Sequence, residues 1–150
     1  MKNQEFEQRI EKYLKRQFGI TISAASKRQV YEALMSTVRE KLSEKKFAYE
    51  QELKKTKQKR AYYMSMEFLV GRTLRNNLFN LGIEKETKEY LEKNNFNLDE
   101  IYDIEPDPGL GNGGLGRLAS CYLDALTSSD YPVTGFSILY EYGIFKQVIN

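Results

Sequence analysis

The residues with the clearest chemical signature are five of the chain's ten glycines, which fall between positions 109 and 116. They are Gly109, Gly111, Gly113, Gly114 and Gly116. The apolar residues that follow recur at helical spacing and predict a core-facing helix that starts near Gly113. These residues are Leu115, Leu118, Ala119, Tyr122, Leu123 and Leu126. Because a helix start presents free backbone N–H groups and a positive dipole end, and glycine lets a ligand approach closely, the pattern predicts a loop that binds phosphate or carboxylate.

Other interpretations of the glycine run remain open at this point. A glycine cluster can be only a turn. The G-x-G-x-x-G pattern also occurs twice in overlapping frames, with Glu141 placed where a ribose-binding acid could follow, so dinucleotide binding is an alternative. Pro106 and Pro108 count against it, because proline removes hydrogen-bond donors that a central strand needs. A nucleoside-triphosphate loop fits less well, because Arg117 and Leu118 stand where a lysine and a hydroxyl are required.

Composition restricts the function classes further. The chain has 150 residues, 41% of them hydrophobic and 29% charged, which is enough to bury a globular core. Its net charge of only +2 gives no support for a nucleic-acid partner or a membrane surface. The basic residues between 54 and 60 are interpreted as a solvated helix end.

The sequence also contains few residues of the types that bind metals or form disulfides. It has no histidine, and no group of other residues has metal-ligand spacing, so we expect no metal site. The single cysteine, Cys121, excludes an internal disulfide and fits a reducing compartment, and we expect it to pack beside the apolar stripe. No signal peptide or membrane-spanning run is predicted.

Residues 1–60 are predicted to form helices that precede an α/β segment. One apolar stripe consists of Phe6, Ile10, Tyr13, Leu14 and Phe18 and stops at Gly19. Another consists of Val30, Leu34, Val38 and Leu42, with Ser23 as its expected N-cap. Over residues 47–59, Phe47 and Leu53 alone do not decide whether the helix continues.

From Ala61 onward the pattern becomes mixed. We expect a buried strand over 61–66, helices over 71–81 and 84–93, and strands over 132–140 and 144–149. Leu74, Leu78 and Leu81 would line the first of these helices and Gly82 would end it, and Tyr90 and Leu91 would face inward from the second. The sequence therefore predicts an α/β fold, with a helical segment over 1–60 and an α/β lobe over 61–150.

Three ordered motifs resemble the α-glucan phosphorylases, the family of glycogen, starch and maltodextrin phosphorylases. The run GLGNGGLGRLA from Gly109 to Ala119, followed by Cys121, Leu123 and Asp124, is similar to the family's glycine-loop segment. The run YYMSMEFL from Tyr62, with Gly71 and Arg72, resembles its first core strand and the following turn. The run YEYGIF from Tyr140, with Gln147, resembles a third segment. The resemblance covers about residues 20–150.

This resemblance implies a pyridoxal 5'-phosphate enzyme of the cytoplasm that cleaves terminal α-1,4-linked glucose with inorganic phosphate to give glucose 1-phosphate. The implied fold has two Rossmann-like lobes (GT-B type), and this chain would end inside the N-terminal lobe. The cofactor lysine and the catalytic groups of the other lobe would lie outside the chain, so no residue here is expected to be catalytic. The implied partners are α-glucan, phosphate and a second subunit.

The motif also assigns site residues. The backbone N–H groups of Gly113 and Gly114 would hold the substrate phosphate, and Asn112 and Leu115 would border the glucose. Glu67 would lie near the same pocket, although an exposed acid at a strand end is an equal alternative.

The chain departs from the usual family pattern at two places. Ser137 and Leu139 stand where the family usually has glycine and arginine, and Ser129 with Asp130 replaces a more apolar pair. Loss of the arginine would alter a strand-edge ion pair or a subunit contact.

Overall fold

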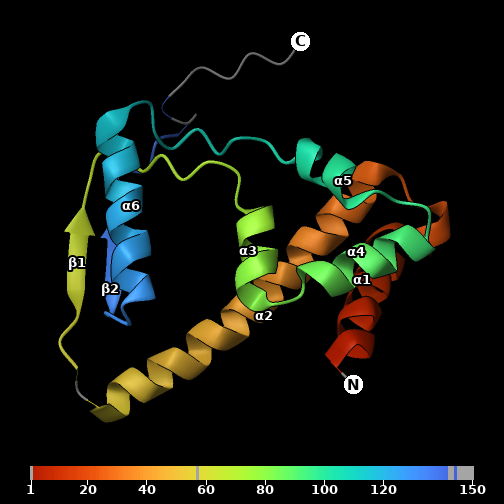
Figure 1. The fold of residues 1–150 in the computed structure, drawn as a ribbon, viewed down its shortest axis with the longest axis horizontal. Coiled ribbons are helices and arrows are strands. Elements are labelled where there is room, and N and C mark those ends of the chain that lie inside the picture. The colour runs from red at the N-terminus through yellow and green to blue at the C-terminus, as the bar shows by residue number, and fades with distance from the viewer. Residues whose placement is uncertain (1, 57, 142–143, 145–150) are drawn as a thin grey trace. The chain divides into compact units, whose positions relative to one another are not determined.

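A computed structural model of the chain describes residues 2–56, 58–141 and 144 (Figure 1). The elements are α1 (Lys2–Phe18), a 3-10 helix η1 (Ile22–Ala24), α2 (Lys27–Thr56), β1 (Ala61–Met64), α3 (Leu74–Leu81), α4 (Glu84–Lys93), α5 (Leu98–Ile104), α6 (Gly114–Ser128) and β2 (Val133–Phe136). The described chain is thus mainly helical, with a small parallel sheet.

Contacts between residues divide the chain into two compact units. Unit 1 comprises Met1–Ala48 and Thr73–Pro106, and unit 2 comprises Tyr49–Arg72 and Asp107–Asn150. This division differs from the expected boundary after residue 60, and the expected domains of 1–60 and 61–150 stay a prediction.

The core of unit 1 confirms the two N-terminal apolar stripes except at Leu42, which is exposed. From α1, Phe6, Ile10 and Leu14 are buried at 3% exposure or less. Gly19 has a φ of +70°, which lets the chain turn directly after the helix. The core also contains Val30, Ala33, Leu34, Val38, Leu74, Leu78, Tyr90, Leu91, Leu98 and Ile101.

The start of α2 differs from the sequence prediction. Ser23, the expected cap, lies inside η1, and Ser26 is the residue that caps the helix. The N–H of Gln29 donates to Ser26 Oγ at 3.3 Å, and the N–H of Ser26 donates to Gln29 Oε1 at 2.8 Å. This reciprocal pair is a capping box, which satisfies two N–H groups at once. The helix then continues through residues 47–56, where Leu53 is buried.

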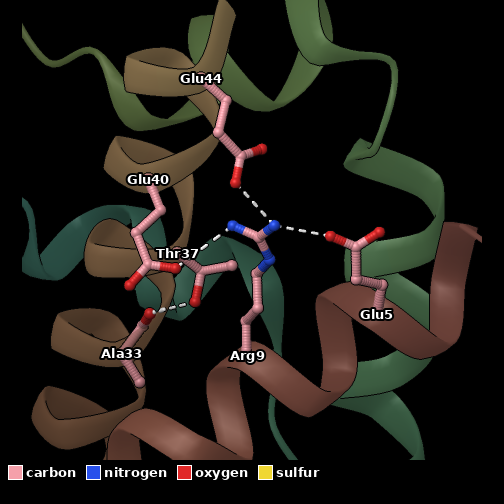
Figure 2. Close-up of polar contacts among 6 residues, drawn as sticks. All are labelled: Glu5, Arg9, Ala33, Thr37, Glu40 and Glu44. Atoms are coloured by element: carbon pink, nitrogen blue, oxygen red, sulfur yellow. Dashed lines mark hydrogen bonds and ion pairs between the residues drawn. The ribbon is translucent and has the colours of Figure 1, made fainter.

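Arg9 ties α1 to α2 within unit 1 (Figure 2). Its guanidinium lies 2.6 Å from Glu5 Oε1, 2.7 Å from Glu44 Oε1 and 3.3 Å from Glu40 Oε2. The hydrogen bond from Arg9 lowers the pKa of Glu5, and the hydrogen bond to Glu44, with that to Glu5, raises the pKa of Arg9. The guanidinium therefore bridges carboxylates from both helices.

The remaining helices of unit 1 largely agree with the sequence pattern. Gly82 ends α3 in the left-handed region with a φ of +68°, as predicted. Tyr90 and Leu91 face inward from α4, also as predicted. Helix α5 was not predicted, and its start is fixed by the side chain of Asn97, which accepts a hydrogen bond from the Asp99 N–H at 2.8 Å.

Unit 2 contains the parallel pair of β1 and β2, in register from Ala61 opposite Val133 to Met64 opposite Phe136. Helix α6 lies along β2 (Figure 1). Both strands are shorter than predicted. The prediction that β1 is buried is wrong, because Tyr62 is 62% and Met64 83% exposed. The strand expected over 144–149 lies outside the described residues except for Ile144.

Helix α6 starts where the glycine pattern predicts, with Gly113 as its N-cap. Its buried face is formed by Gly116, Ala119 and Ser120, and is therefore rotated from the predicted stripe. Leu115 is 79% exposed, Leu118 and Tyr122 are each about half exposed, and the expectation that Cys121 packs inside is wrong because it is exposed.

Candidate functional site

The glycine loop in unit 2 is held by the segment that follows β1. The N–H of Phe68 donates to the carbonyl of Leu110 at 2.7 Å, and the N–H of Leu69 donates to the carbonyl of Gly116 at 3.0 Å. Two segments far apart in sequence therefore run side by side and fix the start of α6.

Glu67, on this same segment, anchors the loop with its carboxylate. Oε2 accepts from the N–H of Asn112 at 2.7 Å, and Oε1 accepts from the N–H of Gly116 at 3.0 Å. Glu67 is half-buried, not the exposed strand-end acid that was the alternative. A carboxylate at the start of a helix is favoured by the dipole and by the charge-assisted hydrogen bonds. Part of the predicted anion site is therefore filled by the chain's own acid.

The next backbone donors remain open. The N–H groups of Gly113, Gly114 and Leu115 donate to no acceptor among the residues that the structure describes. Asn112 and these three residues are all exposed to solvent. The first turn of α6 thus presents adjacent N–H groups that an external anion can reach.

The fold itself requires glycine at three positions of the loop. Gly109 has a φ of +63°, which other residues rarely adopt. A Cβ at Gly111 would collide with the backbone of Leu69. A Cβ at Gly116 would come within 2.9 Å of Glu67 Cγ and Cδ. Backbone conformation thus explains Gly109, and close packing explains Gly111 and Gly116.

Packing does not explain Gly113 and Gly114. Neither has a positive φ, and a Cβ built at either one meets no heavy atom of the described chain within 4 Å. These are the two positions for which the motif implies contact with phosphate.

A hollow of about 280 Å³ lies in unit 2 at the carboxyl ends of β1 and β2. It is lined by Met64, Ser65, Met66, Phe136, Ser137 and Ile138. The carboxyl ends of parallel strands are the usual place for ligands in α/β sheets. Glu67, which holds the glycine loop, is the next residue in sequence after Met66 of this wall.

Ser137 and Leu139, the two residues of the first departure from the family pattern, have different surroundings. The hydroxyl of Ser137 donates to the carbonyl of Met66 at 3.0 Å, and so does the hydroxyl of Tyr140 at 3.1 Å. Leu139 is 96% exposed. Ser137 therefore has a structural contact, whereas Leu139 places an apolar side chain in solvent.

The structure does not favour the dinucleotide alternative. That fingerprint needs a strand immediately before its glycine loop. Here helix α5 comes before the loop, and residues 105–112 between α5 and α6 contain no strand.

Comparisons with known proteins test the family resemblance. Residues 91–150 match the family model of the carbohydrate phosphorylases. The chain is 45% identical to a glycogen phosphorylase of Chlamydia pneumoniae over 126 residues. This aligned region covers 84% of the chain and 15% of that relative. The chain belongs to the carbohydrate phosphorylase family. The resemblance identified from its three motifs is therefore confirmed.

Two further relatives of this phosphorylase chain come from distant organisms. The liver form of human glycogen phosphorylase is 42% identical over 128 residues, or 85% of the chain and 15% of the relative. The alpha-glucan phosphorylase 1 of Arabidopsis thaliana is 51% identical over 92 residues, or 61% of the chain and 10% of the relative. The chain thus spans about 15% of the length of the first relatives it matches. Among the described helices, none combines the length and apolarity needed to cross a membrane.

Proposed function

We propose that this chain is part of an α-glucan phosphorylase, in which it forms the start of the N-terminal Rossmann-like lobe of a GT-B fold. The enzyme would cleave a terminal α-1,4-glucosidic bond of glycogen or maltodextrin with inorganic phosphate. Relatives that carry the names glycogen phosphorylase and alpha-glucan phosphorylase support this proposal. A homodimer in the cytoplasm is proposed from the same family resemblance.

In this proposal the N–H groups of Gly113 and Gly114 bind the substrate phosphate. The observation that carries it is the open pair of donors at two glycines that packing does not require. Fixed donors of this kind stabilise charge without reorganising during the reaction. Asn112 and Leu115, exposed on either side of these donors, would border the glucose.

Glu67 would serve the loop in two ways. Its carboxylate fixes the backbone at Asn112 and Gly116, on both sides of the phosphate donors. A negative charge beside a bound phosphate also disfavours full ionisation of that phosphate. In phosphorolysis a phosphate oxygen forms the new bond to glucose C1 while the bond from C1 to the glycosidic oxygen breaks, and that oxygen needs a proton. A substrate phosphate that is still protonated at this step therefore has a proton to give to that oxygen.

None of the described lysines fits as the covalent attachment site of the cofactor that the resemblance implies. Pyridoxal phosphate, when bound, supplies in this family a phosphate group that exchanges a proton with the substrate phosphate. A lysine that forms a Schiff base is typically held in a desolvated pocket. Every lysine whose side chain the structure describes is exposed, apart from the half-buried Lys41, so these lysines do not fit covalent attachment.

The proposal is tested with the full-length protein, loaded with pyridoxal phosphate and supplied with maltodextrin and inorganic phosphate. We expect glucose 1-phosphate to form, with a rate that saturates in phosphate. A parallel titration with a nicotinamide dinucleotide should give no binding. Nucleotide binding without glucose 1-phosphate would reject the proposal in favour of the dinucleotide alternative.

A further inference from the structure

The chain after β2 holds a carbonyl group that none of the steps above uses. The carbonyl oxygen of Met66 accepts from the hydroxyl of Ser137 at 3.0 Å and from the hydroxyl of Tyr140 at 3.1 Å. A carbonyl oxygen has two lone pairs, so both of its acceptor positions are filled. These residues all belong to unit 2. The peptide group that links Met66 to Glu67 is therefore held by two side chains from a distant part of the sequence.

The backbone of Glu67 is fixed on its other side by Ser65. The hydroxyl of Ser65 donates to the carbonyl of Glu67 at 2.8 Å, and the N–H of Glu67 lies 3.4 Å from the same oxygen. The N–H of Ser65 in turn donates to the carbonyl of Phe136 at 3.0 Å, which extends the pairing of β1 with β2 by one step. Both peptide groups of Glu67 therefore have a fixed orientation.

The carboxylate of Glu67 connects this fixed backbone to the glycine loop. It accepts from the N–H groups of Asn112 and Gly116, which lie on both sides of the open donors. Hydrogen bonds weaken steeply as their angles depart from linearity, so a rotation of the backbone at Glu67 would loosen both contacts. The orientation of the Met66 carbonyl therefore affects the geometry of the open donors.

The chain after β2 makes two further contacts around the loop. The N–H of Ile144 donates to the carbonyl of Gly109 at 3.2 Å, at the start of the loop. Ser137 and Met66 both line the hollow of about 280 Å³, so the hydrogen bond between them joins its two walls. The chain after β2 thus contacts the loop itself and the segment that anchors it, and both lie in the same unit.

We propose that Ser137 and Tyr140 are positioning residues for phosphate binding. Their hydroxyls hold the carbonyl of Met66, which orients Glu67 and, through its carboxylate, the open N–H groups of the loop. The phosphate role rests on the proposed function, whereas the restraint on the loop does not. Because two hydroxyls share one acceptor, either of them alone keeps most of the restraint.

The test compares Ser137→Ala, Tyr140→Phe and the double variant in the full-length protein. The matched controls are Ser129→Ala, Tyr131→Phe and their double variant, because Ser129 and Tyr131 are exposed residues of unit 2 whose hydroxyls form no hydrogen bond with a described residue. Phosphate KM and kcat are measured for each variant. Hydrogen exchange followed by mass spectrometry reads the peptide 107–118, with and without inorganic phosphate, and a reference peptide from α1.

We expect each single variant to raise phosphate KM about twofold and the double variant roughly tenfold, the range that follows from losing a neutral hydrogen bond. The double effect should exceed the product of the single effects, because the remaining hydroxyl still holds the carbonyl in each single variant. Exchange in 107–118 should rise in parallel, kcat should fall less than KM rises, and the reference peptide should not change.

A conservative replacement distinguishes positioning from a general loss of stability. Ser137→Thr keeps a hydroxyl, so in the Tyr140→Phe background it should give the phosphate KM of Tyr140→Phe alone. The control variants should keep the wild-type KM and loop exchange. If the double variant does not fold, Tyr140→Phe alone is read against Tyr131→Phe.

An unchanged phosphate KM in the variants of Ser137 and Tyr140, while phosphate protects the wild-type loop from exchange, would overturn the inference. An equal change in the control variants, or no rescue by Ser137→Thr, would overturn it as well. Faster loop exchange in the double variant, combined with no protection of the wild-type loop by phosphate, would support the restraint and reject the phosphate site of the proposed function.

Discussion

The carboxylate of Glu67 accepts a hydrogen bond at 3.0 Å from the N–H of Gly116, which lies 49 residues further along the chain. The absence of a side chain at Gly116 is what allows this contact, because a Cβ there would come within 2.9 Å of the same carboxylate. The pair explains why the helix after the glycine loop starts where it does. This hydrogen bond also distinguishes the backbone N–H groups that bind the chain's own carboxylate from the neighbouring N–H groups that are open to a ligand.

Replacing Glu67 should loosen the loop. Glu67→Ala leaves the N–H groups of Asn112 and Gly116 without their acceptor. We expect a loss of roughly 1.5–3 kcal/mol in the free energy of unfolding, as for hydrogen bonds to charged groups. Denaturant unfolding measures it, with Glu89→Ala as control, since Glu89 is exposed and forms a surface ion pair with Lys85. Equal stability of the two variants would contradict the anchoring role.

Local signals predicted much of unit 1. The stripe of Phe6, Ile10 and Leu14 and the left-handed end at Gly82 follow from spacing and residue type within one helix. The cap of α2 was assigned to Ser23, although Gln29 three residues after Ser26 was a readable sign of a capping box.

Unit 2 was harder to predict because its determining contacts are long-range. The loop was located from its glycines and the family motif placed Glu67 near the same pocket, but no local pattern indicates that its carboxylate binds Asn112 and Gly116. The buried face of α6 was misplaced because Gly116 and Ser120 do not count as apolar, although close packing buries both.

The ion pair of Arg9 makes stability depend on pH in the acidic range. The hydrogen bond from Arg9 lowers the pKa of Glu5 below 4.5, so the pair's contribution is complete above that unfolded-state value and is lost as the pH falls through the folded-state pKa. Glu5→Gln should therefore flatten the fall in unfolding free energy below about pH 4.5 and change little at neutral pH. Chemical unfolding at a series of pH values checks this, and an unchanged slope would contradict it.

The 150-residue chain by itself should be inactive. It spans about 15% of its relatives' length, and its described lysines do not fit a Schiff base. We expect no glucose 1-phosphate from glycogen and phosphate and no pyridoxal absorbance that survives gel filtration. Either signal would contradict the proposal that catalysis needs residues beyond this segment.

The isolated chain should also associate through the apolar side chains that unit 2 leaves exposed on its strands and just after them. Met64 is 83% and Leu139 96% exposed, and exposed apolar surface of this kind promotes self-association. Leu139→Arg, which restores the residue type usual in the family, should shift the sedimentation profile toward monomer. The control Lys88→Arg, on an exposed helix face of unit 1, should not. A wild-type chain that is already monomeric with a sharp cooperative melt would show a self-sufficient domain.

The most direct test of the phosphate site is the pair of variants Gly114→Ala and Gly82→Ala in the full-length enzyme. Gly114 has no positive φ and no neighbour near a new Cβ, so alanine should leave the thermal midpoint unchanged or raise stability by up to about 1 kcal/mol. The methyl group would occupy the approach to the donors, and kcat/KM for phosphate should fall about 100-fold or more. Gly82→Ala, at a φ of +68°, should cost about 1 kcal/mol and leave turnover per folded molecule intact. If Gly114→Ala keeps normal phosphate affinity and turnover, the loop is only a turn and the account is wrong.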